Sequence, residues 1–275
     1  MFKIKIKNKE IILKNSLLKI LFIFYMMIKK TLKRKIIDSD EYWRFRAKQE
    51  GNSKILWKNE KYNSLIRKVQ REFLEPIINS KFYENSSEIL ILDIGCGIGE
   101  LSSIISTFNS KIKIDAVDFE EMINVAKTIN SKPQINYIVS SAENYYDEVK
   151  KYDIIISAGC FSAIKNISKM KKSITNCANM TKEKSKIIMM DPFHKWNYLA
   201  RVKISVQKII QFTEDLGFDL IIKQGRFFWP YRVYYAESII NDEILEKKFY
   251  QGEKLLKIFG EHIWSDYKFL VFQKK

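Results

Sequence analysis

The sequence predicts an α/β fold in which a mostly parallel sheet carries helices on both faces. Candidate strands recur at residues 89–92, 111–117, 135–139 and 153–157, and candidate helices separate them. Ile89–Leu92 is apolar without interruption, as expected for a strand that is buried on both faces. Strands that alternate with helices along the chain are typical of parallel sheets, because a helix connects each strand to the next.

A glycine-rich loop follows the first run. Asp93 is succeeded by Gly95, Gly97 and Gly99, and helical spacing resumes at Leu101. Glycine adopts positive φ easily and lets a ligand lie against the backbone. Open α/β sheets bind ligands at such loops, beyond the carboxyl ends of their strands. A dinucleotide site would need a small residue at position 100, but a glutamate there would repel a pyrophosphate.

The pattern Asp-x-Gly-x-Gly-x-Gly at residues 93–99 resembles the first motif of the class I S-adenosylmethionine-dependent methyltransferases. The resemblance covers about residues 88–220. It implies a Rossmann-like seven-stranded sheet with six parallel strands and one antiparallel strand, and helices before the sheet that cap the site. It also implies S-adenosyl-L-methionine as the cofactor, a sulfonium that tolerates an acidic loop. The same motif would place Asp93, Gly95, Gly97 and Gly99 at the cofactor.

Composition fits a folded enzyme with a basic surface. The chain has 275 residues, of which 46% are hydrophobic and 13% aromatic, enough for a large core. Its net charge of +16 favours anionic partners, or else reflects a coding bias toward Lys, Ile and Asn. Cys96, Cys160 and Cys177 show neither metal-ligand spacing nor disulfide pairing, which suits a reducing cytoplasm.

Residues 1–37 form a basic and apolar extension. Lys3–Lys7 alternates like a short strand, and Leu17–Ile28 is almost wholly apolar but shorter than the roughly 20 residues that span a bilayer. A basic cluster follows it. The segment is therefore a peripheral anchor on the anionic inner face of the membrane, a helix packed on the domain, or a non-native extension before Met26 or Met27.

Residues 38–85 are expected to be the helical cap. Tyr42, Trp43 and Arg46 lie close together there, either as core or facing a substrate. Pro76 is expected to begin the last helix or a turn before the sheet. The methyltransferase domain proper is expected over residues 86–275.

The second and third strands end in polar residues. In the resembled family an acid at the position of Asp118 binds the ribose hydroxyls, and a carboxylate suits a vicinal diol. By the same resemblance Ser141 and Ala142 touch the adenine, and Glu143 reaches its exocyclic amine. The alternatives are helix N-caps, formed by Asp118 in one case and by Ser140 or Ser141 in the other.

The fourth and fifth strands are expected to end at the acceptor. Phe161 would face the substrate there, while Cys160, with no basic neighbour in sequence, is interpreted as packing. After the strand at residues 187–190, His194 is the candidate general base, Asp191 would orient it, and Trp196 would line the substrate pocket. A surface turn is the alternative for His194. No metal site is expected, because Asp153 opens its strand instead of closing it.

The last third of the chain is expected to contain a helix over residues 202–216, a strand over 218–222 and an antiparallel strand over 267–272. A helical insertion is expected at about residues 236–262. The aromatic block at residues 227–235 is either a pocket wall or core, and Arg232 within it is a candidate for an acidic substrate group. His262 is interpreted as structural.

The function that these features favour is O-methylation of a small-molecule, lipid-linked or glycan acceptor. The alternative is an RNA or protein methyltransferase that uses the basic surface. Nucleic-acid amino groups are less expected, because the chain has no Asn-Pro-Pro-Tyr-type motif. A non-catalytic relative that has lost its cofactor is the remaining alternative. The sequence does not specify the acceptor or the oligomeric state.

Overall fold

A computed structural model of the chain describes residues 2–6, 9–13, 39–48, 56–84, 88–193, 204–236 and 238–275. At the amino terminus β1 (Phe2–Ile6) pairs antiparallel with β2 (Lys9–Leu13). This pairing agrees with the strand predicted from the alternating lysines and isoleucines. The apolar run at residues 17–28 lies outside the described residues, so its role as an anchor stays a prediction. Among the described helices, none is long and apolar enough to cross a membrane.

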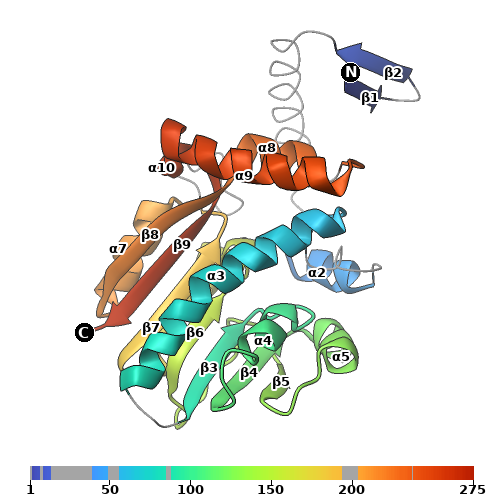
Figure 1. The fold of residues 1–275 in the computed structure, drawn as a ribbon. Coiled ribbons are helices and arrows are strands. Elements are labelled where there is room, and N and C mark those ends of the chain that lie inside the picture. The colour runs from blue at the N-terminus through green and yellow to red at the C-terminus, as the bar shows by residue number, and fades with distance from the viewer. Residues whose placement is uncertain are drawn as a thin grey trace.

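Seven strands form the main sheet in the order β5-β4-β3-β6-β7-β9-β8 (Figure 1). Neighbours from β5 to β7 run parallel, and β9 is antiparallel to both β7 and β8. Six strands therefore share one direction and one opposes them, as predicted. The strands are β3 (Ile89–Ile94), β4 (Ile112–Asp118), β5 (Ile135–Val139), β6 (Tyr152–Ser157), β7 (Thr181–Asp191), β8 (Phe218–Phe228) and β9 (Ser265–Lys274).

The strand order places a crevice beside β3. The chain runs outward from β3 through β4 to β5, then returns to β6 on the other side of β3. The loops that leave β3 and β6 therefore diverge to opposite sides. Ligands of open α/β sheets bind at this kind of switch point, outside the carboxyl ends of the strands.

Helices cover both faces of the sheet. Side chains from α3, α4, α8 and α9 pack on one face, and those from α6 and α7 pack on the other. Figure 1 shows α3 crossing in front of the strands. The helices are α2 (Ser39–Ala47), α3 (Glu60–Glu84), α4 (Glu100–Ile105), α5 (Glu120–Ile129), α6 (Ile167–Asn179), α7 (Val206–Asp215), α8 (Trp229–Tyr235), α9 (Asp242–Phe259) and α10 (Glu261–Trp264), with a short 3-10 turn η2 (Phe161–Ala163).

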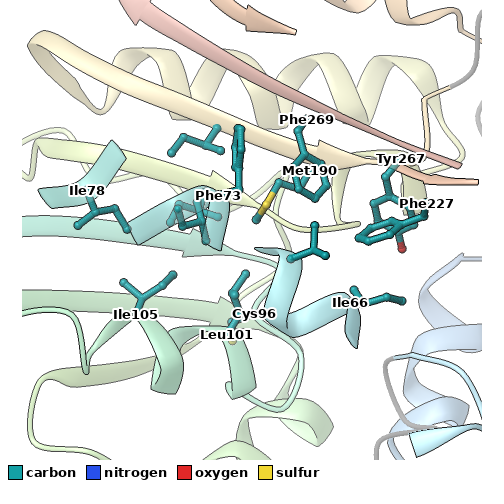
Figure 2. Close-up of a cluster of buried hydrophobic side chains, with 14 of the residues drawn as sticks. Ile66, Phe73, Ile78, Cys96, Leu101, Ile105, Met190, Phe227, Tyr267 and Phe269 are labelled. Carbon is teal, nitrogen blue, oxygen red and sulfur yellow. The ribbon is translucent and has the colours of Figure 1, made fainter. Parts of the chain in front are cut away.

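The larger core lies between α3 and the sheet (Figure 2). Strand residues alternate between the faces: Ile91 faces α3, whereas Leu92 belongs to the opposite cluster. The rings of Phe73 on α3 and Phe269 on β9 lie 4.9 Å apart. Because Phe269 is fully buried, its truncation to alanine would cost about 3–5 kcal/mol.

One local prediction was wrong, and the structure decides between the two alternatives for the aromatic block in favour of core. Pro76 begins neither a helix nor a turn but lies inside the 25-residue α3, where its missing N–H removes one helical hydrogen bond. The aromatic block is not a pocket wall along its length. It ends β8 and folds into α8, and Phe227, Phe228 and Tyr235 are buried in aromatic contacts.

Candidate active site

The glycine loop wraps over the end of β4. The amides of Gly95 and Cys96 both donate to the carbonyl of Val117, at 2.8 and 3.0 Å. The amide of Gly97 donates to Oδ2 of Asp118 at 2.7 Å. Gly95 and Gly97 have φ of +74° and +58°, a region that favours glycine. The loop thus forms the floor of a cleft whose wall is the end of the neighbouring strand.

Two of the glycines allow close packing. A Cβ on Gly95 would stand 2.4 Å from the Cβ of Cys160, in the loop that follows β6. A Cβ on Gly99 would stand 2.2 Å from the phenol oxygen of Tyr137. Gly95 and Gly97 line the cleft, as the predicted cofactor role requires. Gly99 is not among the described lining residues. It is the N-cap of α4 and packs against Tyr137, and its predicted contact with the cofactor stays a prediction.

Asp93 holds the base of the loop. It is 1% exposed, and its Oδ2 accepts a hydrogen bond from the Ser102 hydroxyl at 2.5 Å. Burial raises the pKa of Asp93 to about 6, although Ser102 and the charge of Arg67 oppose the rise. Asp93 also lines the cleft. Its carboxyl therefore contributes negative potential where the loop meets α4.

Asp118 lies at the centre of the cleft wall. Its Oδ2 accepts from the Gly97 amide and its Oδ1 from the Phe119 amide, each at 2.7 Å. Burial raises its pKa to about 6 against these two hydrogen bonds. The N-cap of α5 is Phe119, so the capping alternative for Asp118 is wrong. Each carboxylate oxygen keeps a second lone pair for a ligand hydroxyl.

The predicted adenine residues lie together beyond β5, where Ser141, Ala142 and Glu143 all line the cleft. No helix begins in residues 140–151, all of which are described, so the alternative of an N-cap at Ser140 or Ser141 is wrong. Oγ of Ser141 is buried and makes no hydrogen bond of ordinary geometry within the described part of the chain, but it lies near the Glu143 carboxylate and helps to lower the pKa of that group. A ligand in the cleft would add the hydrogen bond that this buried hydroxyl lacks.

Glu143 already has a partner. Its Oε1 lies 3.1 Å from Nζ of Lys169 on α6, and the residue is 9% exposed. Burial alone would raise the pKa of Glu143, but its backbone hydrogen bond and Lys169 lower it below the ordinary value. Glu143 is therefore ionised at neutral pH and remains an acceptor for an amine.

The opposite wall of the cleft comes from the cap. Tyr42, Trp43 and Arg46 of α2 line it, together with Trp57. Nη1 of Arg44 lies 2.6 Å from Oε2 of Glu121, which fastens α2 to α5. Tyr42 and Trp43 thus face the cleft, while Trp43 also packs on a small buried cluster, so both alternatives for the α2 aromatics remain open.

Sequence reasoning missed Tyr267. This residue of β9 lines the cleft, and its phenol oxygen lies 4.0 Å from the position of a Cβ on Gly159. It reaches the cleft because β9 inserts antiparallel next to β7. Nothing in the neighbouring sequence indicates this role, because a tyrosine in an apolar strand is ordinarily interpreted as part of the core.

Two predicted site residues, Phe161 and Asp191, are fully buried. Phe161 is fully buried in the core beneath η2, so it does not face a substrate. Asp191 is also fully buried, and its two oxygens accept from the Ser157 hydroxyl and the Ser162 amide, each at 2.9 Å. It connects the end of β7 to the end of β6 and to η2 through these hydrogen bonds. Its predicted part in catalysis, to orient His194, depends on a residue outside the described ranges and stays a prediction.

Arg232 forms an internal ion pair. Its Nε and Nη2 donate to the two oxygens of Asp266 at 2.8 and 2.7 Å, and its guanidinium lies 4.7 Å from the ring centroid of Trp57. The residue is 6% exposed. This bidentate pair occupies the two guanidinium N–H groups that a substrate carboxylate would need. The substrate role predicted for Arg232 is therefore wrong.

His194 and Trp196 lie outside the described residues, and their roles stay predictions. Cys160 lines the cleft, but burial raises the pKa of its thiol well above the ordinary value, which agrees with packing instead of nucleophilic attack. The described ranges contain no cluster of His, Cys, Asp and Glu that could hold a metal ion.

Comparison with known proteins agrees with this geometry. Residues 91–184 match the family model described as a methyltransferase domain. The chain is 35% identical over 133 residues to malonyl-[acyl-carrier protein] O-methyltransferase 2 of Ilyobacter polytropus, covering 47% of this chain and 49% of that protein. It is 28% identical over 116 residues to the malonyl-[acyl-carrier protein] O-methyltransferase of Bacillus anthracis, covering 42% of each. The chain spans about half the length of the curated relatives it matches.

Among solved structures, the N-methyltransferase NodS of Bradyrhizobium japonicum in complex with S-adenosyl-L-homocysteine aligns with a TM-score of 0.56. The alignment covers 86% of this chain and 99% of NodS, with 11% sequence identity. At that identity the likeness establishes the fold. The matched model identifies residues 91–184 as a methyltransferase domain, and the fold is that of the class I methyltransferases, which take S-adenosylmethionine as methyl donor. This domain contains the glycine loop, Asp118 and Ser141.

Proposed function

We propose that this methyltransferase binds S-adenosylmethionine along Gly95 and Gly97 and transfers its methyl group to an oxygen of a small acid held on a carrier or lipid. In the proposed pose the ribose hydroxyls donate to Asp118, and the adenine lies against Ser141 and Ala142. The buried hydroxyl of Ser141 supports this pose, because it makes no hydrogen bond of ordinary geometry within the described chain and a ligand there would supply one. The pocket residues therefore fit the donor.

The electrostatics of the cleft also suit this donor. Asp93, Asp118 and Glu143 all line it; Asp93 and Glu143 are buried, and Asp118 is half-buried. Buried carboxylates favour a nearby cation more strongly than exposed ones do. When bound, the donor supplies a methyl group on a positively charged sulfur. A negatively charged cleft stabilises the bound sulfonium. This attraction is lost after transfer, when the sulfur has become neutral.

The cap wall supports an anionic or amphipathic acceptor. It combines the aromatic side chains of Tyr42, Trp43 and Trp57 with the guanidinium of Arg46. Nη1 and Nη2 of Arg46 donate to Tyr42 Oη and to the Leu56 carbonyl, at 2.7 and 2.6 Å. These contacts hold the guanidinium within the cap. An aromatic wall with a fixed cation matches an acid on an apolar or thioester-linked stem.

A carboxylate acceptor fits the described chemistry for a second reason. Methyl transfer is an in-line displacement in which an oxygen lone pair forms the new bond to carbon as the carbon–sulfur bond breaks. A carboxylate oxygen is already ionised at neutral pH and needs no base. A hydroxyl acceptor would need one, and His194 remains our candidate for that case, with Trp196 as a proposed neighbour of the acceptor. The names of the relatives, malonyl-[acyl-carrier protein] O-methyltransferases, point the same way.

The test compares two acceptors that differ in one carboxyl group. The protein is incubated with methyl-labelled S-adenosylmethionine and either a malonyl or an acetyl thioester of an acyl carrier protein. We expect label only in the malonyl thioester, as a methyl ester that mild alkali releases. Gly97→Arg, which fills the loop, should abolish the transfer while keeping the fold.

Label in neither thioester would refute the proposed acceptor. RNA, protein, quinone-precursor and glycan fractions of a cell extract serve as parallel acceptors in the same assay. Incorporation into RNA or protein instead would favour the alternative that uses the basic surface.

A further inference from the structure

More acidic than basic side chains line the cleft. Its described lining includes Asp40, Asp93, Asp118 and Glu143, but only two guanidinium groups, those of Arg46 and Arg67. Both the methionyl part of the proposed donor and the proposed acceptor carry a carboxylate. A carboxylate that enters a cleft with several acids needs a cation to offset its desolvation.

Arg67 is built into this site by fixed contacts. It comes from α3, outside the matched domain, and is 8% exposed. Its Nε donates to Oε2 of Glu100 at 2.8 Å, and its Nη1 donates to Oε1 of Gln70 at 2.7 Å. Glu100 begins α4 directly after the glycine loop. The two contacts therefore hold the guanidinium plane beside the loop.

One nitrogen of Arg67 remains for a ligand. Nη2 has no acceptor among the residues that the structure describes. Because Arg67 lines the cleft and is otherwise buried, the cleft is where this nitrogen can meet a ligand. An arginine held in this way presents a rigid donor to a carboxylate.

Arg46 is a weaker candidate for this role beside the loop. Its two terminal nitrogens both donate within the cap, to the Tyr42 hydroxyl and the Leu56 carbonyl. Arg67 is instead anchored to the residue that follows the loop, through Glu100. The position beside the loop, next to the acids that would hold the sulfonium, is therefore that of Arg67.

We propose that Arg67 is the carboxylate receptor of the cleft and a binding residue for the methyl-transfer reaction. This inference rests on the proposed function. The carboxylate comes from the methionyl end of the donor or from the acceptor, and the chemistry of recognition is the same. Glu100 and Gln70 act through Arg67 as positioning residues, because they fix its guanidinium without lining the described cleft.

The experiment uses ligands with and without the carboxylate. Calorimetry measures the affinity of the wild-type protein and of Arg67→Met for S-adenosylhomocysteine and for 5′-methylthioadenosine, which lacks the amino-acid end. The KM for the malonyl thioester is measured in parallel. Arg71→Met is the matched control, since Arg71 lies on the same helix with its side chain 52% exposed and pairs with Glu75 outside the cleft. Thermal unfolding confirms that each variant is folded.

If Arg67 binds the donor, Arg67→Met should weaken S-adenosylhomocysteine about 10- to 100-fold and leave 5′-methylthioadenosine unchanged. If it binds the acceptor, donor affinity should hold and the KM for the malonyl thioester should rise by a similar factor. Arg67→Lys keeps the charge without the fork and should lie between wild type and Arg67→Met. Arg71→Met should match the wild type in every arm.

Equal weakening of both nucleoside ligands would show a merely structural role and overturn the inference. No change in any arm would do the same while leaving the proposed function intact. Failure of the wild-type protein to bind S-adenosylhomocysteine would overturn both.

Discussion

Gly95→Ala tests the contact between the glycine loop and the end of β6. Gly95 has a φ of +74°, and a Cβ there would stand 2.4 Å from the Cβ and 2.5 Å from the Sγ of Cys160. Real Cβ atoms do not approach other carbon atoms so closely, so either the loop or Cys160 must move. The substitution therefore combines two separable costs, backbone strain and overpacking.

The magnitude follows from these two costs. An L-residue in the left-handed region costs about 1–2 kcal/mol, and overpacking a tight site costs about 1–3 kcal/mol. Their sum, about 2–5 kcal/mol, is a large share of a typical folding free energy of about 5–15 kcal/mol. Gly217 offers a matched control, because its φ is +90° and an added Cβ would meet nothing within 4 Å. Gly217→Ala should cost the strain alone.

Urea unfolding of Gly95→Ala, Gly217→Ala and the double variant Gly95→Ala/Cys160→Gly separates the two costs. The double variant removes the clashing Cβ, so it should recover the overpacking part and, measured by calorimetry, some of the lost donor affinity. If Gly95→Ala is no less stable than Gly217→Ala, the loop does not pack on Cys160 and the reasoning about the cleft floor fails.

Three further predictions concern buried charges. Asp118→Ala should weaken S-adenosylhomocysteine about 10- to 100-fold in calorimetry, because it removes the acceptor proposed for the ribose; unchanged affinity would contradict that role. Arg232→Met should lower the free energy of unfolding by about 3–5 kcal/mol, since it removes the bidentate partner of the buried Asp266, without changing the KM for the acceptor. Burial raises the pKa of Asp191 from an ordinary 3.8 to about 6, so the folded state holds a proton that the unfolded chain releases. Stability should therefore fall as pH rises from about 4 to 6, and unfolding curves of Asp191→Asn should lack that part of the fall.

The elements that local sequence determines were predicted well. The run before Asp93, the alternating glycines and the return of helical spacing at Leu101 define β3, the loop and α4, because each signal lies within a few residues of the structure it produces. The same holds for Asp118 at the end of β4. Strand lengths were predicted less well: β7 extends over 11 residues, six of them before the predicted start, where Glu183 and Lys184 obscure the apolar pattern.

The parts of the site that depend on distant partners were not predictable. Arg232 pairs with Asp266, 34 positions away, and nothing near Arg232 in the sequence indicates that its charge is already matched. Phe161 was placed at the correct strand end, but the turn of η2 directs its ring into the core. Tyr267 and Arg67 reach the cleft from β9 and α3, elements outside the recognised motif. Such residues are identified only once the packing is known.

The most direct test of the account is a crystal structure of the protein with S-adenosylhomocysteine. We predict that its homocysteine portion lies along Gly95 and Gly97, its ribose hydroxyls within hydrogen-bond distance of the Asp118 carboxylate, and its adenine against Ser141. A ligand bound elsewhere on the chain, or a cleft closed by side chains in that crystal, would contradict the central claim that this loop holds the methyl donor.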